Sequence, residues 1–305
     1  MQVSVAYLAV LLIWSTTPLG IVWSSETINP TMAVLLRMLI AVVLGALIIV
    51  MKNIELPWHK QAIRLYSYSA LGIFGGMSFS YLAAGYLSSG ILSLSFGLAP
   101  VLSAILARRI LAEPKISNLR KLSMLLSFVG LAIVCADNLS LSGNSIYGLI
   151  FILIAVFLFS LSGVLVKSVS LAIHPMATTV GALTLALPLF IINWWLLDGN
   201  IDISTWQLRS IWATIYLGVF GSLIGFFAYF FILQRLTAST VALITLVTPV
   251  IALTLGALLN DEAINSELVI GAILITLGLA IYHWGEIIVS KVQQKILFYK
   301  HKVKS

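Results

Sequence analysis

The chain has 305 residues, of which 61% are hydrophobic and only 9% are charged. A soluble domain carries about a quarter charged residues, so this composition excludes an ordinary water-exposed globular protein. The formal net charge of +7 comes from Lys and Arg in short segments between long apolar runs, which indicates membrane topology rather than nucleic-acid binding. The single cysteine, Cys135, excludes an intrachain disulfide framework and a cysteine-based metal site.

Ten apolar windows follow one another along the chain, each about 20 residues long, which is the length that spans a bilayer core. No basic segment precedes the first window, so we expect a retained helix and not a cleaved signal peptide. The loops are short and leave no room for a soluble domain. The predicted spans are 3–22, 29–51, 66–86, 88–110, 119–137, 147–169, 176–197, 210–233, 236–259 and 267–286.

The basic residues gather on one side of the membrane if the amino terminus is cytoplasmic. Of the 17 Lys and Arg residues, Arg209 is then in an outer loop and Arg37 is inside a span. The other 15 are in cytoplasmic segments: Lys52, Lys60, Arg64, Arg108, Arg109, Lys115, Arg120, Lys121, Lys167, Arg235, Lys291, Lys295, Lys300, Lys302 and Lys304. This bias follows the positive-inside rule and predicts that both termini are cytoplasmic. The basic tail, 287–305, is expected either to rest on anionic lipid or to be a solvated orientation signal.

The chain contains an internal repeat. A shift of 149 residues places Leu87, Leu94, Pro100, Val101, Leu106 and Glu113 on identical residues at 236, 243, 249, 250, 255 and 262. The same shift places Gly72 and Gly76 on Gly221 and Gly225, and a shift of 145 places Ser15, Ile28 and Pro30 on Ser160, Ile173 and Pro175. We therefore expect two repeats, 1–138 and 146–286, followed by the tail at 287–305.

Five spans per repeat is an odd number, so the second repeat enters the membrane from the opposite side. The predicted fold is an all-α integral membrane protein of ten transmembrane helices in two inverted five-helix repeats. Inverted repeats are an architecture of secondary transporters, in which the substrate site lies near the midplane between the repeats. This topology, and no catalytic motif, is the basis of the functional prediction.

Two long motifs resemble a known family. They are YLAAGYLSSGILSLSFGLAPVLSAILARRILAE at 81–113 and AYFFILQRLTASTVALITLVTPVIALTLGALLNDE at 228–262. With the early Trp-Ser pair and the Pro30…Arg37 spacing, they resemble the EamA family of the drug/metabolite transporter superfamily over essentially the whole chain. The resemblance implies an inner-membrane metabolite carrier, commonly an exporter of amino acids or related compounds. Arg37 has no counterpart in the second repeat, where the shift of 145 reaches Ala182.

Arg37 is the one formal charge well inside a predicted span. It lies seven residues from the outer end of its helix, or about 10 Å deep at roughly 1.5 Å per residue. An intramembrane charge is costly unless it faces the bundle interior or water, so Arg37 is a candidate substrate ligand. The alternative is that Arg37 snorkels or binds helix carbonyls and fixes the packing.

Pro100 and Pro249 lie near the middle of the fourth and ninth spans. Each proline lacks the N–H that would bond the carbonyl four residues earlier, at Phe96 and Thr245, so each is expected to bend its helix. A bend that lines a cavity exposes those carbonyls and offers a place to flex. The alternative is a static kink that serves packing.

Aromatic and hydroxyl side chains share helix faces near mid-depth. Tyr7, Leu11, Trp14 and Pro18 follow one face of the first span, and Ser89, Ser93, Phe96 and Pro100 follow one face of the fourth. Ligand sites are largely apolar and aromatic with a few polar groups. The predicted cavity wall therefore contains Trp14, Arg37, Tyr81, Ser93, Phe96, Phe159, Tyr229 and Thr245, although any one of these aromatic residues could serve packing alone.

The glycine pairs Gly72-Gly76 and Gly221-Gly225 have the spacing that lets helices approach closely. We expect them to serve packing within the protein, with dimerisation as the alternative. Glu113 and Glu262 follow the fourth and ninth spans at opposite faces and are expected to cap helix ends, with gating as a secondary role.

Several chemistries lack candidates in the sequence. No Asp or Glu lies mid-span, there is no Walker A loop, and no paired intramembrane Asp, His or Cys could serve a metalloenzyme or protease. We expect no cofactor, no metal and no enzyme activity. The predicted function is export of a small metabolite across the inner membrane by alternating access, by a monomer or homodimer whose partners are its substrate and membrane lipids. The alternatives are a membrane enzyme or assembly subunit acting on lipid-linked substrates, and a passive channel.

Overall fold

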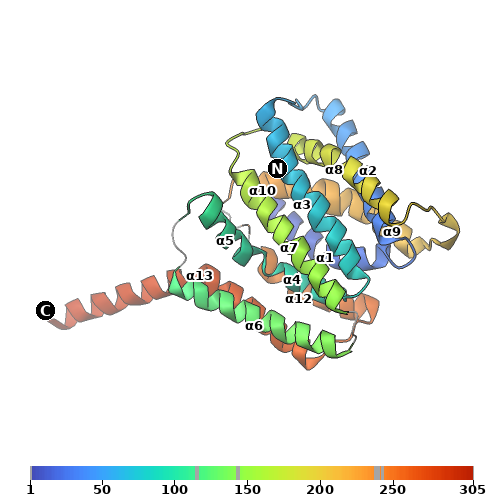
Figure 1. The fold of residues 1–305 in the computed structure, drawn as a ribbon. Helices are drawn as coiled ribbons and strands as arrows, with labels where there is room; N and C mark the ends of the chain where they lie inside the picture. Colours follow the sequence, from blue (N-terminus) through green and yellow to red (C-terminus); the bar gives the residue numbers. More distant parts are fainter. Residues whose placement is uncertain (1, 114–116, 142–144, 237–240, 242–243, 305) are drawn as a thin grey trace.

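The computed structural model describes residues 2–113, 117–141, 145–236, 241 and 244–304, without the side chains of 135, 137–141, 245–246, 283, 287 and 289–304. Every regular element of this described part is helical (Figure 1). The elements of the first half are α1 (Val3–Ser24), α2 (Pro30–Met51), α3 (Lys60–Ala84), α4 (Ser89–Phe96), α5 (Ala99–Ile110) and α6 (Asn118–Leu141). Those of the second half are α7 (Ser145–Lys167), α8 (Pro175–Leu197), η1 (Ile203–Thr205), α9 (Leu208–Tyr216), η2 (Leu217–Ile224), α10 (Gly225–Leu233), α12 (Ile244–Asn260) and α13 (Ser266–Lys304).

The surface of the bundle is apolar. Large hydrophobic side chains such as Leu8, Leu47, Leu122 and Trp195 are more than half exposed, although a soluble protein rarely leaves a large apolar patch uncovered. Six stretches of the described chain are long and apolar enough to cross a membrane: α1, α2, α4 with α5, α7, α8, and α9 with η2 and α10. Shorter apolar helices cover Val247–Asn260 and Ser266–Tyr282. The all-helical membrane class expected from the sequence is confirmed, and the protein is a multi-pass membrane protein.

Packing between the helices is symmetric with respect to the two halves. α2 packs on α8, α6 on α13 and α4 on α12, so each of these pairs joins equivalent helices. The pairing of α3 with α7 has its counterpart in α1 with α9 and α10, and the pairing of α5 with α7 has its counterpart in α1 with α12. Each main helix contact therefore has an equivalent contact when every helix is replaced by its counterpart in the other half.

The equivalent helices differ in two places. The fourth predicted span is broken at Gly97 and Leu98 into α4 and α5, so Pro100 lies in the first turn of α5, where its missing N–H leaves no hydrogen bond unmade. Its repeat mate Pro249 lies inside the continuous helix α12. In the eighth predicted span, residues 217–224 form the π-helix η2, whereas the equivalent stretch of α3 is regular α-helix.

α6 and α13 form a pair beside the rest of the bundle (Figure 1). They approach closely through glycines, because a Cβ on Gly130 would lie 2.7 Å from the carbonyl oxygen of Gly271. Arg120 of α6 joins Glu286 of α13 in an ion pair of 3.0 Å. Beyond this pair, the C-terminal part of α13 projects away from the bundle (Figure 1).

Candidate functional site

Four aromatic side chains meet at the centre of the bundle. Trp14 of α1 contacts Phe159 of α7 edge-on with 5.6 Å between ring centroids, and contacts Tyr229 of α10 at 5.2 Å. Phe159 also contacts Tyr229 at 5.7 Å and Phe96 of α4 at 5.9 Å. Trp14 and Phe159 are repeat mates under the shift of 145, so this aromatic cluster lies where the two halves meet.

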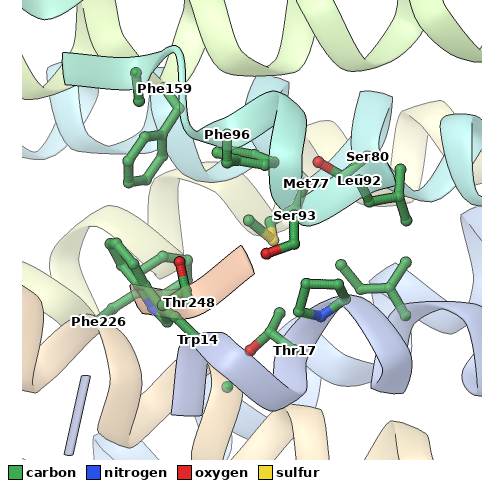
Figure 2. Close-up of a pocket in the computed structure, with 14 residues that line it drawn as sticks. Trp14, Thr17, Met77, Ser80, Leu92, Ser93, Phe96, Phe159, Phe226 and Thr248 are labelled. Atoms are coloured by element: carbon green, nitrogen blue, oxygen red, sulfur yellow. The ribbon is translucent and has the colours of Figure 1, made fainter. Parts of the chain in front are cut away.

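A cavity of about 80 Å³ lies against one side of the aromatic cluster, between α1, α3, α4, η2, α10 and α12. Its wall is apolar except for the hydroxyls of Thr17, Ser80, Ser93 and Thr248. Figure 2 shows Trp14 and Phe159 at one end of this cavity, with Ser80 and Leu92 toward the other. The arrangement suits a small ligand with an apolar body, because such sites are mostly hydrophobic with a few placed polar groups.

A second, larger cavity of about 320 Å³ lies against the other side of the aromatic cluster. Trp14, Ala99 and Phe159 line both cavities, so they form the boundary between them. Glu113, Arg120, Lys167 and Tyr282 also line this second cavity, which we call the vestibule. Glu113 and Lys167 lie near or at the ends of α5 and α7, Arg120 at the start of α6 and Tyr282 near the middle of α13, where the sequence predicts the cytoplasmic face.

At the opposite end of the bundle, a hydrogen-bond network joins α1, α4 and α12. The Glu262 carboxylate accepts hydrogen bonds from the backbone N–H groups of Ser89 (3.0 Å) and Gly90 (3.3 Å) and from the Ser89 hydroxyl (2.9 Å). Asn260 donates to the same carboxylate at 3.1 Å and accepts from the Trp23 indole N–H at 2.7 Å. Glu262 thus caps the N-terminus of α4, where a negative charge is favoured, and we call this network the Glu262 latch.

Glu113, the repeat mate of Glu262, lies in an equivalent turn but has different neighbours. Ala112 and Asp261, the residues before the two glutamates, have left-handed φ angles of 53° and 49°. Both turns therefore leave their helix in the same way. Glu262 reaches across to α4, whereas Glu113 is exposed and lines the vestibule.

Arg37 is 1% exposed and lies apart from the aromatic cluster, between α2 and η2. Its Nε donates to the Ser222 hydroxyl at 2.6 Å, and its guanidinium carbon lies 6.0 Å from the centroid of the Tyr81 ring. Tyr81 is 1% exposed and its hydroxyl accepts a hydrogen bond from Ser24 at 3.3 Å. Neither Arg37 nor Tyr81 lines the cavity, but Gly221 beside Arg37 does.

The other residues proposed from the sequence fall into three groups. Trp14, Ser93, Phe96 and Phe159 line the cavity, while Tyr229 and Pro100 line the vestibule. Pro249 is buried in α12, and the Thr245 side chain lies outside the described side chains. The four glycines lie at helix contacts: Gly72 faces Ser162 and Gly76 faces Phe159 on α7, Gly221 faces Arg37, and Gly225 faces Ile13 and Trp14 on α1.

Sequence reasoning missed part of the wall: Thr17, Met77, Ser80, Leu92, Phe226 and Thr248. Thr17 and Phe226 lie one helical turn from Trp14 and Tyr229, so extending the predicted faces by three residues finds them. The Glu262 latch was missed because it joins residues 173 positions apart. Within the described residues, no cluster of three His, Cys, Asp or Glu side chains could hold a metal ion.

Comparisons with known proteins match this architecture. The model of the EamA-like transporter family matches twice, over residues 3–136 and 146–284. The chain belongs to the EamA-like transporter family. This confirms the resemblance drawn from the sequence motifs and indicates a membrane transporter rather than an enzyme.

Several relatives support the assignment over nearly the full length. A protein of Archaeoglobus fulgidus described as an uncharacterized transporter is 26% identical, with 88% of this chain and 94% of the relative covered. Protein PagO of Salmonella typhimurium is 23% identical with 91% of both chains covered, and the uncharacterized transporter YoaV of Bacillus subtilis is 21% identical. A crystal structure of another protein shares the fold with a TM-score of 0.67 at 16% identity, over 92% of this chain and 95% of that one.

Proposed function

We propose that the protein is a secondary transporter that exports a small, partly apolar metabolite, such as an amino acid or a related compound, across the plasma membrane. The observation that carries this proposal is the cavity between the two halves, with its aromatic cluster and its four hydroxyls. Membership of a transporter family supports the class of activity. The wall chemistry supports the substrate class, because the cavity offers far more apolar than polar surface.

The proposed mechanism is alternating access. The Glu262 latch holds one end of the cavity closed, and the vestibule leads from the other end to the aromatic cluster. A substrate would enter from the vestibule, pass Trp14 and Phe159, and leave when the latch opens. Because the vestibule lies at the predicted cytoplasmic face, this conformation is the one that loads an exported substrate.

Counterflow and efflux from proteoliposomes test the transport function. Vesicles containing the purified protein are preloaded with radiolabelled amino acids, amines, sugars or nucleotides, and release is followed against protein-free vesicles. We expect saturable release of at least one small amphipathic compound. Release that rises linearly with concentration would indicate a channel, and no release of any compound in the panel would contradict the proposal.

A matched pair of tryptophan variants tests the site. Trp14→Ala removes the ring that contacts both Phe159 and Tyr229, so we expect at least a tenfold loss of transport. Trp195→Ala removes a ring that is 69% exposed on the apolar surface of α8, so transport should change little. Equal effects of the two substitutions at equal expression would argue against the aromatic cluster as part of the substrate path.

We further propose ten spans with both termini in the cytoplasm. In this topology α4 with α5 forms one span, as do α9, η2 and α10 together. A thiol introduced by Asp202→Cys should react with an impermeant reagent from outside, whereas thiols from Asn53→Cys and Ser117→Cys should react only after permeabilisation. The opposite pattern would reject this orientation.

A further inference from the structure

Arg37 is a buried cation with incomplete hydrogen bonding. It is 1% exposed, and its one side-chain hydrogen bond in the described structure is the Nε–H to the neutral Ser222 hydroxyl. Nη1 is buried and has no hydrogen-bond partner. The ion pairs of the described part are Arg120 with Glu286 and Arg209 with Glu26, so Arg37 has no counter-charge there. A buried charge left unpaired is costly, and an intramembrane one is a functional candidate.

The π-helix η2 packs closely against both the backbone and the guanidinium of Arg37. A Cβ on Gly218 would lie 3.1 Å from the Arg37 carbonyl oxygen, and a Cβ on Gly221 would lie 3.0 Å from Nη2. Ser222, the next residue, accepts the hydrogen bond from Nε. Single-turn π-helices occur frequently at functional sites, and this one is absent from the equivalent stretch of α3.

Gly221 connects the arginine to the cavity. It lines the cavity on one side and approaches Nη2 on the other, so no side chain at this position separates the guanidinium from the cavity. No ionisable side chain of the described residues lines the cavity itself. An anionic substrate group beside Gly221 would therefore have the Arg37 guanidinium directly behind that glycine.

We propose that Arg37 and η2 form an anion subsite of the cavity, and that the transported substrate carries one carboxylate that reaches this subsite past Gly221. A carboxylate fits better than a phosphate, because one guanidinium and neutral hydroxyls balance a single negative charge and not two. A planar guanidinium also matches a carboxylate through two parallel hydrogen bonds. The repeat mate of Arg37 is Ala182, so the cavity has one such subsite and the substrate has one acidic end. This inference rests on the proposed transport function, which it narrows to apolar monocarboxylates and amino acids.

Paired probes that differ only at the carboxyl group test the subsite. Binding of phenylacetate and phenylacetamide, and of L-phenylalanine and L-phenylalaninamide, is measured on the purified full-length protein by calorimetry. Wild-type protein should bind each carboxylate at least tenfold more tightly than its amide. Arg37→Gln should reduce that preference at least tenfold, with little change in amide affinity. The matched control is Arg64→Gln, since Arg64 also contacts a tyrosine ring, at 5.3 Å, but is exposed.

Two more variants keep the test decisive if Arg37→Gln does not fold. Arg37→Lys keeps the charge without the planar fork and should retain part of the preference. Gly221→Ala keeps the arginine but places a methyl group 3.0 Å from Nη2, and should lower carboxylate affinity more than amide affinity. Equal binding of acids and amides by wild-type protein, or an unchanged preference in folded Arg37→Gln, would overturn the subsite. Transport of a carboxylate substrate that is unaffected by Arg37→Gln would overturn it too, while leaving the transport function intact.

Discussion

Removing the Glu262 carboxylate should open the end of the cavity that, in the proposed mechanism, the latch holds closed. In Glu262→Ala, the N–H groups of Ser89 and Gly90 and the Ser89 hydroxyl lose their acceptor, and Asn260 loses a partner. Glu262→Gln is milder, because its amide oxygen can still accept two of these bonds. Its NH2 group replaces the other carboxylate oxygen and cannot accept hydrogen bonds, so about half of the hydrogen bonds in the network are lost.

The size of the effect follows from the four hydrogen bonds. Glu262 is half-buried and partly screened by solvent, so each bond is taken at about 0.5–1 kcal/mol, which is the low end for an ordinary hydrogen bond and below the range for bonds to buried charged groups. Glu262→Ala then weakens the closed state by about 2–4 kcal/mol, or roughly 30-fold to 1000-fold in the open-to-closed ratio. For Glu262→Gln about half of that free energy is expected, or roughly 5-fold to 30-fold.

The rate at which an external reagent reaches the cavity wall measures the fraction of molecules in which the latch is open. With Cys135 replaced by Ala, a thiol is introduced by Ser93→Cys, at a buried position of the wall. Its reaction with an impermeant reagent added from outside should accelerate at least tenfold in Glu262→Ala and less in Glu262→Gln. Glu267→Ala is the matched control, since this exposed carboxylate accepts its side-chain hydrogen bond from the adjacent Ser266. An unchanged labelling rate in Glu262→Ala would refute the latch.

Two further predictions concern the repeat prolines and a glycine at a helix contact. Pro100→Ala should lower transport several-fold at normal expression, because the alanine N–H can restore a helix hydrogen bond across the break between α4 and α5. Pro249→Ala should have a smaller effect on transport, since α12 is already continuous. Normal transport in both variants would make the prolines packing features. Gly72→Ala should lower the melting temperature of the purified protein, because its Cβ would lie 2.5 Å from the Ser162 hydroxyl oxygen, and such overpacking costs roughly 1–3 kcal/mol. Gly85→Ala is the control, because its Cβ would lie 3.6 Å from the Leu82 carbonyl oxygen, an ordinary contact. Equal melting temperatures for the two variants would contradict the packing argument.

Helix periodicity in the sequence predicted many of the helices and part of the cavity wall. The apolar runs give the helices because a membrane-spanning segment must satisfy its backbone internally. Trp14 and Ser93 were found on helix faces that also carry a proline, and both line the cavity. Such local patterns are visible in sequence because residues three and four apart share a face.

Features that depend on tertiary contact could not be predicted. The break at Gly97 and Leu98 and the π-helix at 217–224 occur in one repeat each, although the repeats share the proline and both glycines. Nothing in the local sequence of Glu262 points to its partner Ser89 on a helix of the other half. Arg37 was identified as unusual from its depth, but its neighbours on η2 are 185 positions away and required the structure.

The two repeats differ at a small residue six positions before each glutamate. In the second half, Gly256 lies directly against the Glu262 carboxylate, and a Cβ there would come within 2.8 Å of the Ser89 hydroxyl oxygen. The equivalent residue in the first half, under the shift of 149, is Ala107, which carries a methyl group. We infer that this methyl group hinders Glu113 from folding back as closely as Glu262 does, although both glutamates follow the same left-handed turn. Near-identical motifs can therefore place their carboxylates differently: Glu262 caps α4, whereas Glu113 is exposed and lines the vestibule.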